Sequence, residues 1–291
     1  MKHFRLIIIG LILTVSIKAQ TFAEKVALKT CDCLDSLQTY KQLEDSIKNC
    51  TSKAMALVMI ESSPDEKKIL NTVQGITGVF KEVNEMLPSY CYNVRRLMIE
   101  EKKRQFYKSS VFLEANEHYE SGNDFMDKND YENSIKEFQK AIKIDPNFIF
   151  AYDHLAISYR RQENYKKAIK YYQKSLEIFP EGEVAILNIA VSYSFLNDYE
   201  NSLKYYNSLI FLFKDNPEGY FGAGKILFIK SDYKNALENI FIAHRIYTKT
   251  NSDYVTDSEK LIGMMYTELK NKGKIDLFKE IAKKYNISIN E

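Results

Sequence analysis

The sequence has few of the residues from which catalytic loops are built. It contains ten glycines and five prolines in 291 residues, and no phosphate-binding, dinucleotide-binding or nucleophile-elbow motif occurs in it. Its four histidines lack the spacing of a metalloprotease. Carboxylate pairs such as Glu100 and Glu101 fall on polar helix faces, with no second group brought to them. We therefore expect no catalytic residues, no metal site and no cofactor, and we interpret the chain as a non-enzyme.

The sequence also lacks an excess of charge of either sign. There are 41 lysines and arginines against 39 aspartates and glutamates, a formal net charge of +2. Such a balance gives no bulk preference for nucleic acid or for an anionic membrane. The longest basic run, Lys102-Lys103-Arg104, follows two glutamates, which favours a solvated helix face over a binding patch. We expect a protein or peptide partner, and no nucleic acid or directly bound lipid.

No apolar run is long enough to span a bilayer. The longest candidate, Leu6–Ile17, is shorter than the roughly 20 residues that a spanning helix needs. It follows a positively charged start containing Lys2 and Arg5 and is followed by Ala19, as in a secretory signal peptide. We predict that residues 1–19 are this signal, with cleavage after Ala19, and that the chain is exported to the periplasm or cell envelope. The alternative is an uncleaved N-terminal membrane anchor.

Cysteine is absent beyond residue 91. The four cysteines, Cys31, Cys33, Cys50 and Cys91, lie in one segment of a chain predicted to be exported, which argues for two disulfides. Because residues i and i+2 point to nearly opposite sides of a helix, Cys31 and Cys33 should bond different partners. Two pairings with Cys50 and Cys91 remain open.

Two other interpretations of the cysteines are less favoured. A redox-active dithiol formed by Cys31 and Cys33 would need a lowered thiol pKa, but the surrounding TCDCLD carries two acids and no base. A zinc site usually has ligands at C-x2–4-C spacing, which this segment lacks. The cysteines are therefore interpreted as structural.

The cysteine segment, residues 20–110, is predicted to be entirely helical. Amphipathic spacing indicates three helices, with breaks near Tyr40 and at Ser62-Ser63-Pro64, and Pro88 is expected to start a further helix through Cys91. The predicted helices cover residues 24–40, 43–62 and 66–87. The segment is thus expected to be a disulfide-pinned helical domain.

The rest of the chain is periodic. Tyr131, Tyr165, Tyr199 and Tyr233 are 34 residues apart, and each follows a short polar turn: KNDY, QENY, LNDY and KSDY. A fixed period of this length indicates one supersecondary unit that repeats. Since a single unit of this size cannot bury its own apolar face, the units must stack.

Small and large residues alternate in phase with this period. With units starting at Ala115, Ile149, Glu183 and Pro217, the eighth position is small in every copy and the twenty-fourth is large. The small set is Gly122, Ala156, Ala190 and Gly224, and the large set is Phe138, Tyr172, Tyr206 and Ile240. Small residues let two helices approach closely while large ones fill the space beside the contact. The pattern indicates an antiparallel helix pair in each unit.

These features resemble the tetratricopeptide repeat (TPR) family, in an exported bacterial form. The resemblance covers residues 115–248, as four repeats, with capping helices expected over residues 249–291. The implied fold class is all-α, a TPR-type helical solenoid preceded by the disulfide-pinned segment. Pro146 and Pro180 close the first two units. Repeat three departs from this pattern, because Lys214 occupies the corresponding position and Pro217 comes three residues later. We therefore expect the second helix of this repeat to be longer than in the other copies.

The resemblance also implies a concave groove, lined by the first helix of each pair. The residues at its lining positions form the predicted partner-binding set: Phe150, Ile157, Arg160, Arg161, Leu187, Val191, Phe195, Phe221, Lys225 and Phe228. Over repeats three and four this set is unusually apolar, which favours an apolar helix or extended peptide as the ligand. The alternative is that the C-terminal helices fold back and fill the groove. A carboxylate clamp of the kind some family members use is absent, which disfavours a chaperone-tail receptor.

The predicted function is therefore a non-enzymatic interaction scaffold or adaptor of the bacterial cell envelope, which holds a protein segment in a preformed groove. One alternative is a structural subunit of an envelope assembly that uses the convex face or the N-terminal domain. A second is a thiol-disulfide redox protein acting through Cys31 and Cys33.

Overall fold

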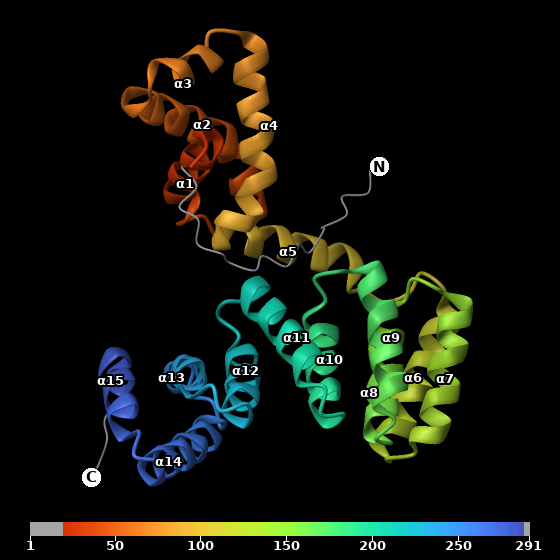
Figure 1. The fold of residues 1–291 in the computed structure, drawn as a ribbon. Coiled ribbons are helices and arrows are strands. Elements are labelled where there is room, and N and C mark those ends of the chain that lie inside the picture. The colour runs from red at the N-terminus through yellow and green to blue at the C-terminus, as the bar shows by residue number, and fades with distance from the viewer. Residues whose placement is uncertain (1–19, 288–291) are drawn as a thin grey trace. The chain divides into compact units, whose positions relative to one another are not determined.

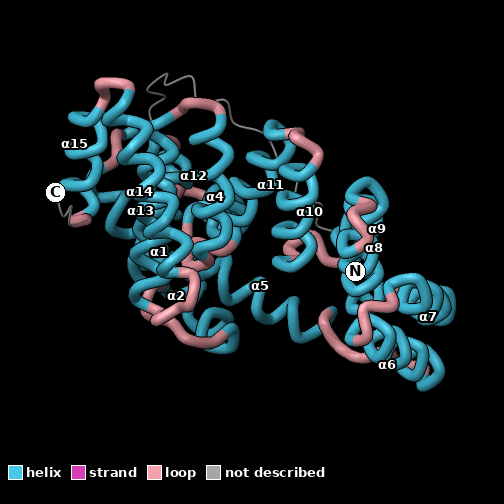
Figure 2. Tube along the Cα trace, turned by 90° about the horizontal axis from the view of Figure 1, so that it is seen from below, coloured by secondary structure: helices cyan, strands magenta, loops and turns pink. Residues whose placement is uncertain are grey.

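The computed structural model describes residues 20–287, and the predicted signal peptide therefore lies outside the described residues. Within that range the secondary structure is α-helical, with no strand (Figure 2). The chain divides into two compact units, Met1–Val94 and Arg95–Glu291, which are considered separately below (Figure 1). No helix in the described part is both long enough and apolar enough to cross a membrane.

The first unit is a small helical bundle organised around its first helix. Helix α1 packs against both α2 and α4 and buries Phe22, Val26 and Leu34 between them. The helices are α1 (Phe22–Leu34), α2 (Tyr40–Glu61), α3 (Pro64–Ile69) and α4 (Val73–Tyr90), followed by the start of α5 (Tyr92–Phe106). All four cysteines lie in or beside these helices.

Capping residues divide the third predicted helix, contrary to our expectation. Ser63 caps α3, where its hydroxyl accepts from the Glu66 amide while the Glu66 carboxylate accepts from the Ser63 amide. Thr72 caps α4 in a similar way, through the amide of Gly75. The predicted helix over residues 66–87 is therefore two helices.

Contrary to our expectation, Pro88 does not begin a helix. It lies inside α4, in the last turn before the helix ends at Tyr90. The chain breaks at Cys91, whose backbone is extended, and α5 begins at the next residue. The helix boundary thus lies at the disulfide-bonded cysteine, three residues after the proline.

The second unit contains four helix pairs of the predicted period and one further pair. In each pair we call the first helix A and the second helix B. The pairs are α6 (Leu113–Asp127) with α7 (Tyr131–Ile144), α8 (Ile149–Arg161) with α9 (Tyr165–Ile178), α10 (Glu183–Phe195) with α11 (Tyr199–Leu212), α12 (Pro217–Ile229) with α13 (Tyr233–Lys249), and α14 (Val255–Asn271) with α15 (Ile275–Tyr285). Each helix packs mainly on its neighbours in sequence (Figure 1), as in a solenoid.

One turn geometry recurs between helix A and helix B. A residue with positive φ stands two positions before each repeated tyrosine: Asn129, Glu163, Asn197 and Ser231. The next residue is an Asp or Asn that caps helix B, by accepting from the backbone amide three residues on. The hydroxyls of Tyr131 and Tyr199 donate to the Asn129 and Asn197 side chains, at 2.6 and 2.8 Å. The tyrosines are thus part of the turn that joins the two helices.

The small eighth position lies directly against the large twenty-fourth position. A Cβ placed on Gly122 would come within 2.5 Å of the Phe138 ring, and one on Gly224 within 2.6 Å of the Ile240 side chain. Phe138 and Ile240 are fully buried. The close approach of helices A and B predicted from the sequence is therefore present.

Repeat three does not contain the longer helix that we expected. Helix α11 has 14 residues, as do α7 and α9. It ends at Leu212, and Phe213 leaves the helical conformation with φ −130°, close to the φ of −131° at Phe179 after α9. Pro217 instead occupies the first turn of α12, where a proline is well tolerated. The end of helix B is thus set without the proline found in the first two repeats.

The last helix pair continues the stack. Helices α14 and α15 pack on α13 and on each other, and make no comparable contact with α8 or α10 within the described residues. Their shared core includes Phe241, Met265 and Phe278. The alternative in which these helices fold back and fill the groove of repeats three and four is therefore not observed over α10. At the end of α12, α14 lies beside Phe228 and Ile229 across a shared hollow.

Helix α5 lies along one edge of the repeats. From Arg95 onward it belongs to the second unit, where Ile99 packs into a cluster with Ile149, Phe179, Ile186 and Leu209. These four side chains come from the ends of helices B and the starts of helices A in repeats two and three. The helix therefore covers an edge that successive repeats form together.

Candidate interaction surface

The A helices form the inner layer of the repeat unit. Helices α6, α8, α10 and α12 contact one another in succession, whereas within residues 20–287 the B helices make no comparable contacts among themselves. The layer whose helices are closer together lies on the inside of a curved stack. We call the exposed side of these four helices the inner face.

The predicted residues of repeat two are unequally accessible. Phe150 and Ile157 are half-buried, and the Phe150 ring packs on Tyr107 at 5.3 Å between ring centroids. Arg160 is half-buried, and its Nε has no hydrogen-bond partner among the described residues. Arg161 is exposed. Of these four predicted residues, only Arg161 is thus fully exposed to solvent.

In repeat three, one predicted residue stands out from the surface. Leu187 and Val191 are half-buried and pack against Ala190, Tyr206 and other core residues. The side chain of Phe195 is 59% exposed, and its ring stacks on Tyr165 at 4.9 Å between centroids. A large apolar side chain at the end of α10 therefore remains in contact with solvent.

The predicted residues of repeat four mainly pack internally. Phe221 meets the Tyr247 ring edge-on, and Phe228 meets the Tyr233 ring, both at 6.0 Å between centroids. Lys225 is exposed and its amino group lies 5.7 Å from the Phe221 ring. Ile229, which follows Phe228 at the end of α12 and also occupies a lining position of the repeat, is 55% exposed.

A hollow lies between the end of α12 and the face of α14. Its volume is about 630 Å³, and its apolar lining comes from Phe228, Ile229 and Met264. Polar groups on its rim include Thr267 and Glu268. The inner face thus continues past repeat four, as a partly apolar depression that the sequence pattern did not predict.

Asp153 occupies an inner-face position but is covered. It is 2% exposed, and its Oδ2 accepts a 2.7 Å hydrogen bond from the hydroxyl of Tyr107, which follows α5. Burial raises the pKa of Asp153 to about 6, while the hydroxyls of Ser175 and Tyr107 act in the opposite direction. Burial, with the nearby Asp153 charge, also raises the pKa of Tyr107. No local sequence pattern indicates this contact, because Tyr107 and Asp153 are 46 positions apart in the chain.

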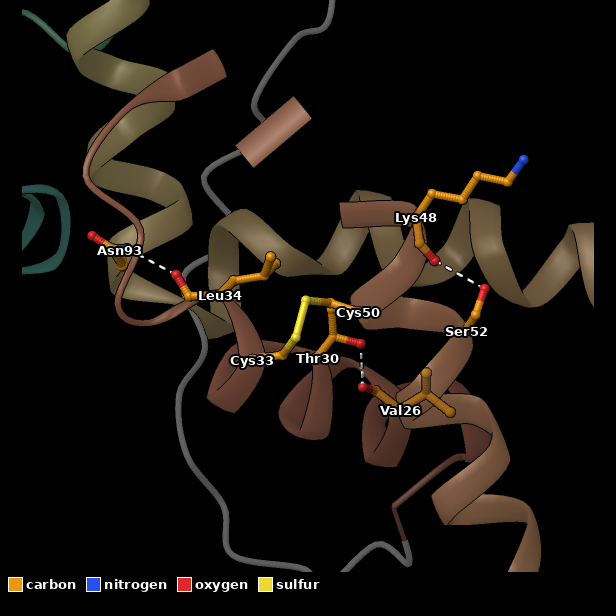
Figure 3. The surroundings of a disulfide bond; sticks show 8 residues. All are labelled: Val26, Thr30, Cys33, Leu34, Lys48, Cys50, Ser52 and Asn93. Carbon is orange, nitrogen blue, oxygen red and sulfur yellow. Dashed lines mark hydrogen bonds between the residues drawn. A yellow bond between two sulfur atoms is a disulfide. The ribbon is translucent and has the colours of Figure 1, made fainter. Parts of the chain in front are cut away.

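The cysteines form two separate disulfides in the first unit. Cys31 bonds Cys91. Cys33 bonds Cys50, as Figure 3 shows. This is one of the two pairings left open by the sequence, and it confirms that Cys31 and Cys33 have different partners. Cys50 and Cys91 are each 4% exposed. The arrangement is that of structural cross-links, with no dithiol between Cys31 and Cys33.

Polar contacts support the same part of the bundle. The Thr30 hydroxyl donates to the Val26 carbonyl at 2.8 Å, and the Asn93 side chain donates to the Leu34 carbonyl (Figure 3). The Asn93 side chain also donates to the Leu37 carbonyl. Asn93 therefore holds the end of α1 close to the start of α5. Among the described residues, no three His, Cys, Asp or Glu side chains converge in a way that could hold a metal ion.

Comparisons with known proteins agree with this repeat geometry. A family model described as TPR repeat matches residues 122–162, and one described as tetratricopeptide repeat matches residues 147–210. No curated protein sequence matches the chain. The family matches fall on α6 to α11, where the period is most regular.

Similar solved structures have the same fold. A crystal structure of MamA protein is 18% identical, with a TM-score of 0.50, over 59% of this chain and 89% of that one. A MamA structure from Desulfovibrio magneticus RS-1 is 12% identical, with a TM-score of 0.51, over 60% of this chain and 95% of that one. At these identities the likeness concerns the fold alone. The family models, together with the helix-pair geometry, show that the chain contains tetratricopeptide repeats.

Proposed function

We propose that the chain is a non-enzymatic scaffold whose inner face binds a segment of another protein. Tetratricopeptide repeats in general mediate protein–protein interactions, and the fold and family matches support that broad role. The observation that carries the proposal is the pair of exposed apolar residues on successive A helices, Phe195 on α10 and Ile229 on α12, at 59% and 55% exposure. Large apolar side chains that gather on one face mark interaction sites.

The charges on the inner face indicate the chemistry of the partner segment. Arg161 and Lys225 are exposed there, whereas Asp153 is buried and Glu218 accepts the hydroxyl of Tyr247 at 2.6 Å. The accessible charge over α8 to α12 is therefore positive. We propose a segment with apolar side chains for Phe195 and Ile229 and an acidic group for Arg161 or Lys225.

Export is part of this proposal. The predicted signal peptide and the two disulfides support a place in the periplasm or cell envelope, where disulfides persist. Rigid helix pairs would present the binding residues with little ordering cost on association. The predicted set Phe150, Ile157, Leu187, Val191, Phe221 and Phe228 would then form the wall behind the exposed residues.

The test uses exposed positions, because Phe221 and Phe228 also support internal packing. Phe195→Asp combined with Ile229→Asp should abolish capture of partner proteins by the immobilised protein from a cell-envelope extract. Val111→Asp is the matched control, since Val111 is 83% exposed and precedes α6. If the double variant captures the same proteins in the same amounts as the control, the inner face is not the binding surface.

A second candidate function has one specific observation in its favour. The first unit exposes apolar side chains on three consecutive helices, namely Leu57 and Ile60 on α2, Ile69 on α3, and Val73 and Ile76 on α4. These would suit the structural subunit of an envelope assembly that associates through the N-terminal unit. A native-mass measurement on the wild type and on Ile60→Asp tests this, since an assembly formed through this face would dissociate in the variant.

A further inference from the structure

A cavity lies between α5 and the edge of repeats two and three. Its volume is about 370 Å³, within the size range of small-ligand sites. Aromatic walls come from Tyr107, Phe150, Phe179 and Phe213, with Ile99 and Val184 completing the apolar lining. This cavity lies wholly within the second unit.

A buried carboxylate with an unused acceptor lines the cavity. Glu181 is 5% exposed, and its Oε1 forms an ion pair with the Lys102 Nζ at 2.6 Å. Its other oxygen, Oε2, is buried without a hydrogen-bond partner among residues 20–287. A buried acceptor left unpaired costs about 1–3 kcal/mol, so the site favours a donor that reaches this oxygen.

The burial of Glu181 is peculiar to this repeat. The residues at the same position in the other three repeats, Asn147, Asp215 and Lys249, are all exposed. Glu181 differs because α5 passes over the loop between α9 and α10 and supplies Lys102. The cavity is therefore a product of α5 and is not a general feature of the repeats.

The other charged groups of the lining have partners or point to solvent. Glu100 pairs with Arg96 at 2.7 Å, and a Glu183 oxygen accepts from the Asn216 amide at 2.7 Å. Lys103 is exposed. The lining thus holds three carboxylates, and the nearby cations are Arg96 and Lys103 in the lining and Lys102, which pairs with Glu181.

We propose that this cavity binds a guanidinium or ammonium group, with Glu181 Oε2 as its acceptor and the aromatic walls around its aliphatic stem. Aromatic faces attract cations within about 6 Å of the ring centroid. A carboxylate and aromatic rings together suit the head and stem of an arginine or lysine side chain. The same chemistry could come from a partner protein or from a free polyamine. The proposal does not depend on the two residues that carry the inner-face proposal, since neither Phe195 nor Ile229 lines the cavity, although Phe150 belongs to both sites.

The test titrates the full chain with acetyl-arginine amide, its citrulline analogue and spermidine, and follows the NMR signals of the Gly182 and Val184 amides. One side chain should bind with a Kd of about 1 mM. Citrulline, which keeps the shape but loses the charge, should bind at least about tenfold more weakly. Stronger binding of spermidine would identify a free polyamine as the source, and stronger binding of arginine would identify a protein side chain.

Two variants and one matched control complete the test. Glu181→Gln should weaken arginine binding by about tenfold or more, and Val184→Trp should fill the cavity and abolish it. Glu177→Gln, which changes an exposed carboxylate on α9 paired with Lys174, should leave binding unchanged. Phe195→Asp should also have no effect. Equal binding of arginine and citrulline, full affinity in Glu181→Gln, or no binding of any probe at about 10 mM would overturn the proposal. Should Glu181→Gln fail to fold by circular dichroism, Val184→Trp and citrulline still decide it.

Discussion

The two units of the chain hold their helices together by different means. In the first unit, the cross-links Cys31–Cys91 and Cys33–Cys50 tie α1 to its neighbours. In the second, no cysteine is present, and a small residue set against a large one repeats from pair to pair, as between Gly122 and Phe138. A unit of fewer than 100 residues has a small core and benefits from covalent cross-links, whereas a stack gains core with each added pair.

The largest expected effect is that reduction lowers the stability of the first unit and leaves that of the second unchanged. Removing both disulfides is expected to destabilise the first unit by about 2–5 kcal/mol for each bridge, because the unfolded chain gains conformational freedom. The repeats should melt at the same temperature with and without reductant. Differential scanning calorimetry with and without dithiothreitol checks this, with Cys33→Ser/Cys50→Ser as a single-bridge control. A matching fall in the melting temperature of the repeats would contradict the distinction.

Asp153 should make the second unit sensitive to pH. Its pKa is raised to about 6 in the folded state, from 3.8, because burial disfavours the charged form. The folded state thus binds more protons than the unfolded state between these values, so this contribution to stability is complete below pH 3.8 and is lost as the pH rises through 6. Nearby Tyr107, Tyr119 and Tyr172 have raised pKa values and stay neutral over this range.

Asp153→Asn should therefore stabilise the repeats by about 1–3 kcal/mol at pH 7 and remove the pH dependence between pH 4 and 6. Urea unfolding of wild type and variant at several pH values measures both effects. Asp127→Asn, at the exposed end of α6, is the control. Parallel stability curves for wild type and Asp153→Asn would show that Asp153 is not the responsible group.

A glycine pair tests how closely the helices approach in the repeats. Gly222→Ala should destabilise the second unit by about 1–3 kcal/mol, because the new Cβ would lie 2.1 Å from the Tyr206 ring. Gly263→Ala on α14 has no atom within 4 Å of its Cβ and should stabilise by about 0.5–1 kcal/mol through helix propensity. Opposite signs in urea unfolding are the expected result, and a loss of stability in both would point to a general intolerance of alanine.

The smallest expected effect concerns the turn between the helices. Glu163 takes the positive φ that asparagine occupies in repeats one and three. Glu163→Asn should stabilise the unit by about 0.5–1 kcal/mol, because asparagine tolerates the left-handed region better. The control is Gln162→Asn, one residue earlier, where φ is negative. Thermal unfolding measures the stability of both variants. An equal gain in the control would show that the stabilisation does not come from the positive φ at position 163.

The sequence predicted the repeats well because their rules are local and recur. Each copy contains the polar turn, the tyrosine and the small and large positions, and four copies in phase reinforce one another. The length of α11 was predicted wrongly, because we expected the helix to continue toward Pro217, whereas it ends at Leu212. The choice between the two cysteine pairings depends on how α1, α2 and α4 pack, which no local pattern records.

The parts of the surface that depend on distant contacts were missed. Asp153 occupies a repeat position that faces the groove, but Tyr107 covers it. Phe221 and Phe228 belong to the predicted partner-binding set, but their rings pack on those of Tyr247 and Tyr233. Repeat position predicts which way a residue faces, and it does not predict what another segment places over it. The boundaries of the domains and the binding role of the predicted groove residues stay predictions.

The position of α5 limits how the repeat array can change in length. A simple stack can gain or lose a copy at any joint, because each copy contacts only its neighbours. Here one rigid helix meets both repeat two and repeat three, through Ile99 near Ile149 and Arg95, whose guanidinium carbon lies 3.9 Å from the centre of the Phe211 ring. An extra copy inserted between repeats two and three would move one of these contacts out of reach, so α5 restricts growth or shortening of the array at this joint.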